Sequence, residues 1–275
     1  MVRKPPTRST VVTVAGLFLA FVGWTALTFT WSGLSAVDQA LRPPSITAGS
    51  VLGQLTSALA LLTWPGVVYA AVAVLAVRAH RQTLRQLAVA LGLIIVLGWG
   101  SAKVLELLLR RPRPAQALEV ITTTGYSYPA GHLVAVVAGT VAVTATYAVT
   151  RRPLTSRLAW QLGAGVLVVV VALNRWLMGA HYVTDLVGGA LLGGLAAGLA
   201  LMIAGVTVPA PVEVVTELVR RRTEPEQEPA RELRCAVIYN PIKIADWMTF
   251  RRSVEYELRT RGWQRPLWLE TTEDD

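Results

Sequence analysis

Two short segments combine a histidine with residues that suit a phosphate group. In the first, Tyr128-Pro129-Ala130-Gly131-His132 opens an apolar stretch. In the second, Asn174-Arg175 is followed after five residues by His181 and after three more by Asp185. A histidine can attack phosphorus or protonate a leaving oxygen, and a guanidinium fork can hold phosphate oxygens. The residue types therefore point to phosphoryl transfer.

The spacing assigns a role to each of these residues. If a helix begins near His181, Asp185 lies one turn further on the same face. Its carboxylate can then accept a hydrogen bond from one ring N–H, which fixes the tautomer and leaves the other nitrogen nucleophilic. The segment ending at Gly131 leads into a helix N-terminus, whose free amides suit a phosphate. His132 in that first turn is placed to act as a general acid.

A third segment adds positive charge near a phosphate. It consists of Lys103 followed by Arg110, Arg111, Pro112, Arg113 and Pro114. Arg113 and Arg175 can hold phosphate oxygens and balance the charge that develops during transfer. A zinc site made by His132, His181 and Asp185 is the chemical alternative. It leaves the arginines unexplained, because cations repel a dication.

The elements that position these residues are predicted to be membrane-spanning helices. The chain has 275 residues, of which 53% are hydrophobic and 16% charged, whereas a soluble domain carries about a quarter charged residues. A hydrocarbon core needs about 20 helical residues to cross. Six stretches are long enough: 11–31, 57–77, 87–109, 132–150, 158–178 and 186–208. The fold predicted is an all-α six-transmembrane-helix bundle over residues 1–208.

Basic residues predict the orientation of this bundle. They gather before the first span, in every second loop and after the sixth span: Arg3, Lys4, Arg8, Arg78, Arg81, Arg85, Arg151, Arg152, Arg157, Arg220, Arg221 and Arg222. By the positive-inside bias, both termini are cytoplasmic and the protein is expected in the inner (plasma) membrane. Arg110, Arg111, Arg113 and Arg175 fall on the opposite side. Their position against this bias favours ligand binding at the outer face.

The three segments resemble the type 2 phosphatidic acid phosphatase superfamily. That family's pattern is K-x6-R-P, then P-S-G-H, then S-R-x5-H-x3-D, in a six-span fold with the site on the outer face. The resemblance covers roughly residues 10–208. It implies His181 as the nucleophile, Asp185 as its orienting partner and His132 as the general acid, without a cofactor. It also implies a set of phosphate ligands, namely Lys103, Arg113, Arg175 and the loop at Ala130 and Gly131.

The sequence departs from that pattern at three places. Ala130 and Asn174 stand where the family has serine, and Lys103 is out of register with the Arg-Pro pairs. The expected function is hydrolysis of a lipid phosphomonoester or pyrophosphate through a phosphohistidine. The alternative is a membrane scaffold that binds lipid phosphates and turns them over weakly. A small-solute transporter is a weaker reading, since repeated halves with broken helices are lacking.

The remaining residues predict a linker and a small water-exposed unit. Residues 209–233 are rich in Pro, Glu and Arg and form the linker. Residues 234–275 predict a βαβ segment with strands at 235–239 and 266–270 and a helix starting near Asp246. Its Val237-Ile238-Tyr239-Asn240-Pro241 run, through Glu270-Thr271-Thr272, resembles the start of a diacylglycerol-kinase-type domain. That resemblance implies a fused or associated lipid kinase as a possible partner, beside the lipid phosphate substrate and membrane lipids.

Two features of the composition carry less information. The single Cys235 cannot form an intramolecular disulfide. The net charge of +9 lies in arginine clusters between apolar stretches, which is typical of membrane loops and not of nucleic-acid binding.

Overall fold

A computed structural model describes residues 8–43, 46–47, 49–114, 125–208, 216, 235–240, 244 and 246–271. The chain divides into two compact units, Met1–Thr216 and Glu217–Asp275. The predicted linker 209–233 lies, except for Thr216, outside the described residues.

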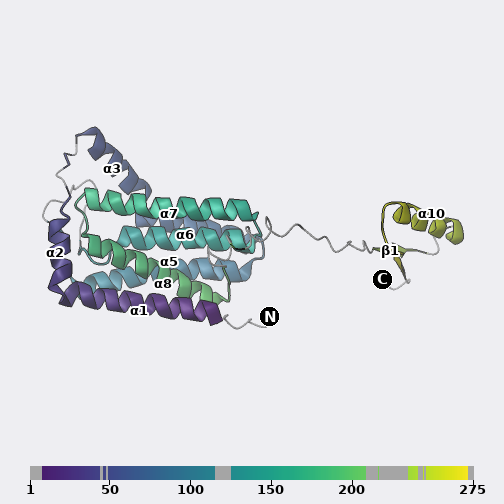
Figure 1. Cartoon of the computed structure of the whole chain (residues 1–275), viewed down its shortest axis with the longest axis horizontal. Coiled ribbons are helices and arrows are strands. Elements are labelled where there is room, and N and C mark those ends of the chain that lie inside the picture. The colour runs from purple at the N-terminus through teal and green to yellow at the C-terminus, as the bar shows by residue number, and fades with distance from the viewer. Residues whose placement is uncertain are drawn as a thin grey trace. The chain divides into compact units, whose positions relative to one another are not determined.

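The first unit is a helical bundle (Figure 1). Its helices are α1 (Arg8–Thr30), α2 (Ser32–Ala40), α3 (Val51–Leu62), α4 (Pro65–Arg81), α5 (Arg85–Leu109), α6 (Gly131–Val149), α7 (Leu154–Leu177) and α8 (Val183–Ala204). Within the described residues, six helical segments are long and apolar enough to cross a membrane, with α3 and α4 together forming the second. The predicted six-span, all-α membrane fold is therefore confirmed.

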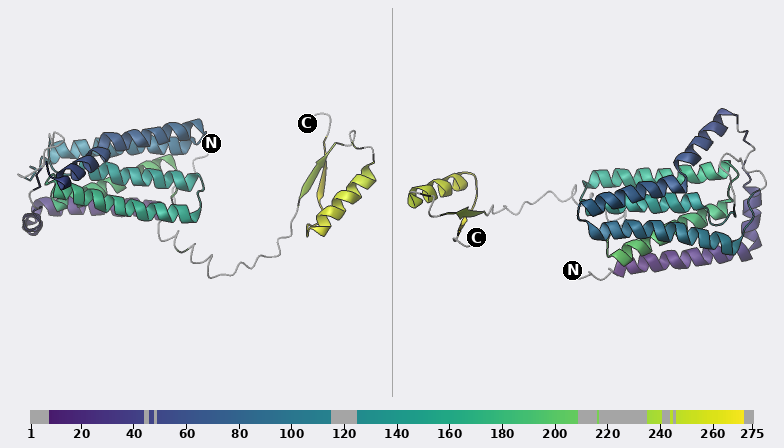
Figure 2. Two further views of the ribbon diagram at one scale, coloured as in Figure 1. Left: turned by 90° about the horizontal axis from the view of Figure 1, so that it is seen from above. Right: turned by 180° about the vertical axis from the view of Figure 1, so that it is seen from behind.

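Helices α5, α6 and α8 form the middle of the bundle, with α7 packed on α6 and α1 packed on α8 (Figures 1 and 2). Glycine allows the close approach of α8 to α6. A Cβ at Gly189 would lie 2.6 Å from the backbone oxygen of Ala130, and one at Gly193 2.7 Å from that of Val134. These glycines thus serve packing inside the bundle.

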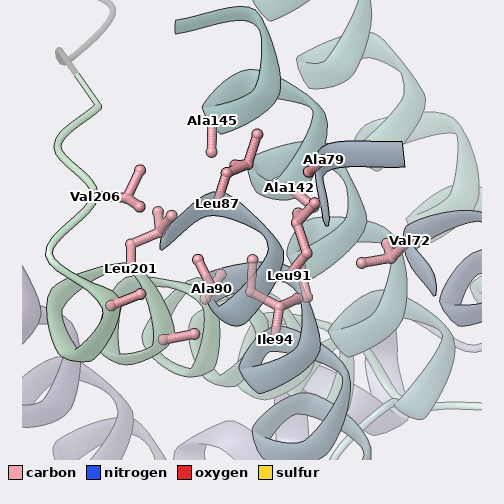
Figure 3. Close-up of a cluster of buried hydrophobic side chains, with 14 residues drawn as sticks. Val72, Ala79, Leu87, Ala90, Leu91, Ile94, Ala142, Ala145, Leu201 and Val206 are labelled. Atoms are coloured by element: carbon pink, nitrogen blue, oxygen red, sulfur yellow. The ribbon is translucent and has the colours of Figure 1, made fainter. Parts of the chain in front are cut away.

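The largest buried apolar cluster joins α4, α5, α6 and α8 (Figure 3). Leu87, Leu91 and Ile94 of α5 are fully buried and face small residues such as Ala142 and Ala145 of α6. Large apolar side chains on the outer surface, such as Leu108, face away from this core. The bundle therefore keeps small residues at helix contacts, as membrane helices do.

Two features of the chain between α1 and α4 were not predicted, namely the division of the second span and the short helix α2. The expected single span 57–77 is divided, because Pro65 lacks an N–H donor and begins α4 at its first turn. The preceding α3 buries small residues and exposes large apolar ones: Gly53, Thr56, Ser57 and Ala60 are buried, while Val51, Leu55 and Leu62 are exposed. The short α2 runs across the end of the bundle (Figure 1).

The second unit consists of β1 (Ala236–Tyr239), α10 (Trp247–Thr260) and β2 (Leu267–Glu270). The two strands are parallel, with Ala236 opposite Leu267. Asp246 caps α10 by accepting a hydrogen bond from the Thr249 amide at 3.1 Å. The predicted strand–helix–strand order is confirmed.

Candidate active site

The three segments singled out in the sequence meet at one end of the bundle. The chain after α5, the loop before α6 and the turn from α7 to α8 all contribute. Nη1 of Arg113 lies 3.4 Å from Nε2 of His181, and Nδ1 of His181 lies 2.8 Å from the backbone oxygen of Ser127. Residues far apart in the sequence therefore surround one imidazole.

His181 is held in a defined tautomer. The Ser127 carbonyl can only accept, so Nδ1 of His181 carries the proton and donates it. The guanidinium of Arg113 can only donate, so Nε2 keeps its lone pair. The pKa of His181 lies well below its ordinary value, because the ring is buried and the positive charges of Arg175 and Arg113 oppose protonation. His181 thus presents a neutral, nucleophilic nitrogen.

Asp185 does not orient this imidazole, so the predicted contact between the two side chains is wrong. The reason is local: α8 begins at Val183, so His181 precedes the helix and the two residues do not share a helical face. Oδ2 of Asp185 instead accepts from the Tyr182 amide at 2.9 Å and from the Ser127 hydroxyl. Ser127 therefore contacts both residues, because its hydroxyl donates to Asp185 and its backbone carbonyl accepts from His181.

A buried polar network supports this end of α8. Arg111 donates to both Asp185 and Asp38, with 2.7 Å between Nη2 and Oδ2 of Asp38. Its pKa is raised, because the attraction and hydrogen bonds of these two carboxylates outweigh its burial. Asp38 in α2 also accepts from the Thr184 amide at 3.2 Å and hydroxyl at 2.6 Å. Arg111 is neutralised within the fold.

The sequence interpretation missed Ser127, Asp38 and the role of Arg111. A signal for Asp38 existed, since acidic residues are rare between residues 10 and 208. A buried carboxylate in such a stretch needs a cationic partner. The sequence alone could not identify Arg111 as this partner, because the contact depends on how α2 crosses the bundle.

Arg113 and Arg175 remain available for an anion. Arg113 donates to the backbone oxygens of Ala180 at 3.0 Å and Gly125 at 3.2 Å, and burial lowers its pKa. Arg175 is 3% exposed, and its Nε has no hydrogen-bond partner among the residues that the structure describes. Neither guanidinium forms an ion pair within that part of the chain. Two such charges beside a neutral imidazole suit a phosphate.

His132 and the start of α6 complete the arrangement. His132 lies in the first turn of α6, within electrostatic range of Arg175 and His181 and close to the Ala60 backbone. Its Nε2 is buried with no partner in the described ranges. Ala130 is the N-cap residue of α6 and makes no side-chain cap, and Gly131 opens the helix. The helix N-terminus lies beside His132, as the sequence predicts.

The contacts of Lys103 differ from the predicted contact with phosphate. Its ammonium group forms an ion pair of 2.7 Å with Glu106, and its side chain is 56% exposed. Glu106 in turn accepts from the Tyr126 amide at 3.0 Å. Arg110 ends α5 in a left-handed conformation with φ 46°, so it does not extend the helical face of Lys103. The contacts of Lys103 thus serve the loop before α6.

The alternative zinc site lacks a suitable donor set. Among the described residues, no group of three His, Cys, Asp or Glu side chains is arranged to hold a metal ion. The carboxylate of Asp185 is already bound by Arg111 and Ser127.

One family model matches the chain. Residues 83–207 match the model of the PAP2 superfamily. This match covers all three segments of the site. It ends before residues 235–271, so the resemblance of that unit to a lipid kinase rests on sequence alone.

A crystal structure of a transmembrane PAP2 type phosphatidylglycerolphosphate phosphatase from Bacillus subtilis is similar to the chain, with a TM-score of 0.41 and 23% identity. The similarity covers 76% of this chain and 98% of the other. The comparison with curated proteins gives no match.

Proposed function

We propose that this protein is an integral membrane lipid phosphatase that works through a phosphohistidine. The observation that carries the proposal is the arrangement of His181, whose N–H is bound by a carbonyl and whose lone pair lies beside Arg113. A nucleophile of this kind needs no further deprotonation. The match of residues 83–207 to the PAP2 superfamily supports the same chemistry.

The reaction would proceed in two steps. Nε2 of His181 attacks the phosphorus, and the bond from phosphorus to the lipid oxygen breaks. His132 gives a proton to that leaving oxygen. In the second step His132 takes a proton from water, which attacks the phosphohistidine and releases phosphate. Arg113 and Arg175 bind the phosphoryl oxygens throughout.

The substrate is proposed to be a phosphomonoester or pyrophosphate of a lipid, of the phosphatidic acid or polyprenyl pyrophosphate type. The site stands at the end of membrane-spanning helices, where a lipid headgroup lies beside its chains. With both termini cytoplasmic, this end faces the outer side of the inner membrane.

The test is phosphate release by the purified full chain in detergent, with a chelator present. Phosphatidic acid, phosphatidylglycerol phosphate and a polyprenyl pyrophosphate form the substrate panel. We expect activity on at least one lipid, and acid-quenched protein should carry labelled phosphate on histidine. His181→Ala should remove both signals, and Arg78→Gln, an exposed change at the other end of the bundle, should remove neither. Activity retained by His181→Ala would refute the mechanism.

A second function is favoured by Ala130 and Lys103. Ala130 gives α6 no side-chain cap, and Lys103 is bound to Glu106. These features fit a membrane scaffold that binds lipid phosphates and turns them over weakly. Ala130→Ser distinguishes the two functions, because the added hydroxyl can donate to phosphate. A large gain from near-zero turnover supports the scaffold, and a small change supports a working phosphatase.

A further inference from the structure

A groove lies in the half of the bundle opposite the candidate active site. Its volume is about 650 Å³. Residues of α1, α6, α7 and α8 line it. Its lining includes Val14, Leu17, Gln161, Ala164, Gly194 and Gly198.

The length of the groove corresponds to one leaflet of a bilayer. It follows α8 from Gly194 to the end of the helix at Ala204. Ten residues of helix rise about 15 Å, which is half of a hydrocarbon core of about 30 Å. The groove therefore belongs to the leaflet on the side away from His181, and the proposed phosphatase reaction does not use it.

Two buried polar atoms belong to the first two turns of α7. Oε1 of Gln161 and Nη2 of Arg157 are buried and have no hydrogen-bond partner in the part of the chain that the structure describes. Arg157, Gln161 and Ala164 are spaced four and three residues apart in α7, so they share one helix face. Gln161 and Ala164 line the groove, and Arg157 lies one turn before Gln161 on the same helix face, nearer the start of α7.

The charges around the groove favour an anion. In the described residues between 8 and 208, the acidic side chains are Asp38, Glu106 and Asp185, which all lie at the active-site end. The groove end carries Arg8, which begins α1, and Arg151 and Arg152, which precede α7. Basic residues at a membrane surface attract anionic headgroups.

We propose that the groove is a binding site for an anionic phospholipid of that leaflet. One acyl chain lies along the apolar lining, and the headgroup phosphate accepts hydrogen bonds from Arg157. The amide of Gln161 stands one turn deeper, at the level of the ester groups, and can turn to donate its NH2 group to an ester carbonyl. An amphiphile with one charged end matches a groove that is apolar inside and basic at its mouth.

The test is native mass spectrometry of the full chain in mild detergent. Phosphatidylglycerol and phosphatidylcholine with identical acyl chains are added in turn. The wild type is expected to retain phosphatidylglycerol in preference. Arg157→Gln should lower this retention about five-fold, the effect of one basic residue near an anionic lipid. Gly194→Leu should block the groove, since a Cβ there meets only Leu17 methyl groups at 3.7 Å.

Two matched variants serve as controls. Arg78→Gln removes an arginine at the same end of the bundle, and Gly16→Leu adds a side chain in open space on α1. Both should retain phosphatidylglycerol as the wild type does. Equal retention by Gly194→Leu and the wild type overturns the proposal, as does equal loss in Arg78→Gln and Arg157→Gln. A lipid-free dimer that Gly194→Leu dissociates also overturns it, since a second copy would then occupy the groove.

Discussion

At the scale of single residues, His181 determines how the site responds to pH. Burial and the charges of Arg175 and Arg113 hold its pKa well below 6.5. The neutral, reactive form exists above the folded-state pKa and is lost below it. We expect the rate of phosphohistidine formation, measured by rapid quench at saturating lipid, to stay level as pH falls through 6.5 and to decline only in stronger acid.

Arg113→Gln supplies the control for this pH profile. Removing one repelling charge raises the pKa of His181, so the acid limb moves to higher pH while the maximal rate falls. The same shift has a consequence for stability: the unfolded chain binds a proton that the folded ring rejects. The bundle should therefore lose stability as pH falls through the unfolded pKa of about 6.5. If the rate of phosphohistidine formation in the wild type already declined above pH 6.5, this low pKa of His181 would be contradicted.

Ser127→Ala tests whether Asp185 acts through Ser127. The Ser127 side chain is fully buried, and the change leaves one buried carboxylate oxygen without its hydroxyl donor. We expect a loss of about 1–3 kcal/mol in the free energy of unfolding. Because Ser127 positions the nucleophile, kcat should fall more than KM changes. Ser35→Ala, an exposed hydroxyl in α2, should leave both unchanged. A change in KM alone would place Ser127 in substrate binding.

At the scale of elements, the sequence predicted where the site lies but not how it is supported. Consecutive spans alternate direction, so the motifs at the end of the third span, at the start of the fourth and in the fifth-to-sixth turn were predicted to share one membrane face. The contact of Asp185 could not be derived, because it depends on whether α8 starts at His181 or two residues later. Such boundaries are the least certain part of a sequence interpretation.

Asp38 is a buried carboxylate that links helix α2 to the bundle. Asp38→Asn weakens a buried ion pair with Arg111 and the contacts with Thr184. Breaking a buried pair costs about 3–5 kcal/mol, although Asp185 still neutralises Arg111 and reduces this cost. The free energy of unfolding in detergent, from a denaturant titration, measures it. Lys103→Met breaks a half-exposed pair and should cost less than about 1 kcal/mol. Equal losses of unfolding free energy in Asp38→Asn and Lys103→Met would contradict the buried network.

Helix α3 should respond to changes on its small-residue face. Ala60 is fully buried against Met178 and Ala180 and its backbone contacts His132. Ala60→Leu overpacks this contact, which costs about 1–3 kcal/mol, and it should lower phosphatase activity by displacing His132. Leu62→Ala, on the exposed face, should leave activity unchanged. Thermal unfolding and phosphate release check the two effects separately, and full activity in Ala60→Leu would show that α3 does not position His132.

At the scale of the whole molecule, the composition was the strongest signal. Six apolar stretches of sufficient length predicted the bundle, because the lipid requirement leaves few other structures for such a chain. The break at Pro65 and the short α2 escaped this reasoning. The mean hydropathy over a window of residues does not detect a short helix such as α2, which crosses the end of the bundle.

The two compact units allow a prediction about the C-terminal residues. The described residues of the site all belong to the unit Met1–Thr216. Removing residues 235–275 should therefore leave kcat on the lipid substrate unchanged within about two-fold, which is less than 0.5 kcal/mol in barrier height. Purified full-length and shortened proteins are compared at equal concentration. A larger loss would mean that the β1–α10–β2 unit contributes to turnover.

The backbone carbonyl of Ser127 affects how this site tolerates mutation. A side chain that accepts a hydrogen bond from a histidine can be removed by a single substitution. Here the acceptor that holds Nδ1 belongs to the main chain. No substitution at position 127 removes it, so mutation can only displace this acceptor. The proton arrangement of His181 is thus robust to point mutation, and its weak points are the residues that hold the Ser127 backbone in place.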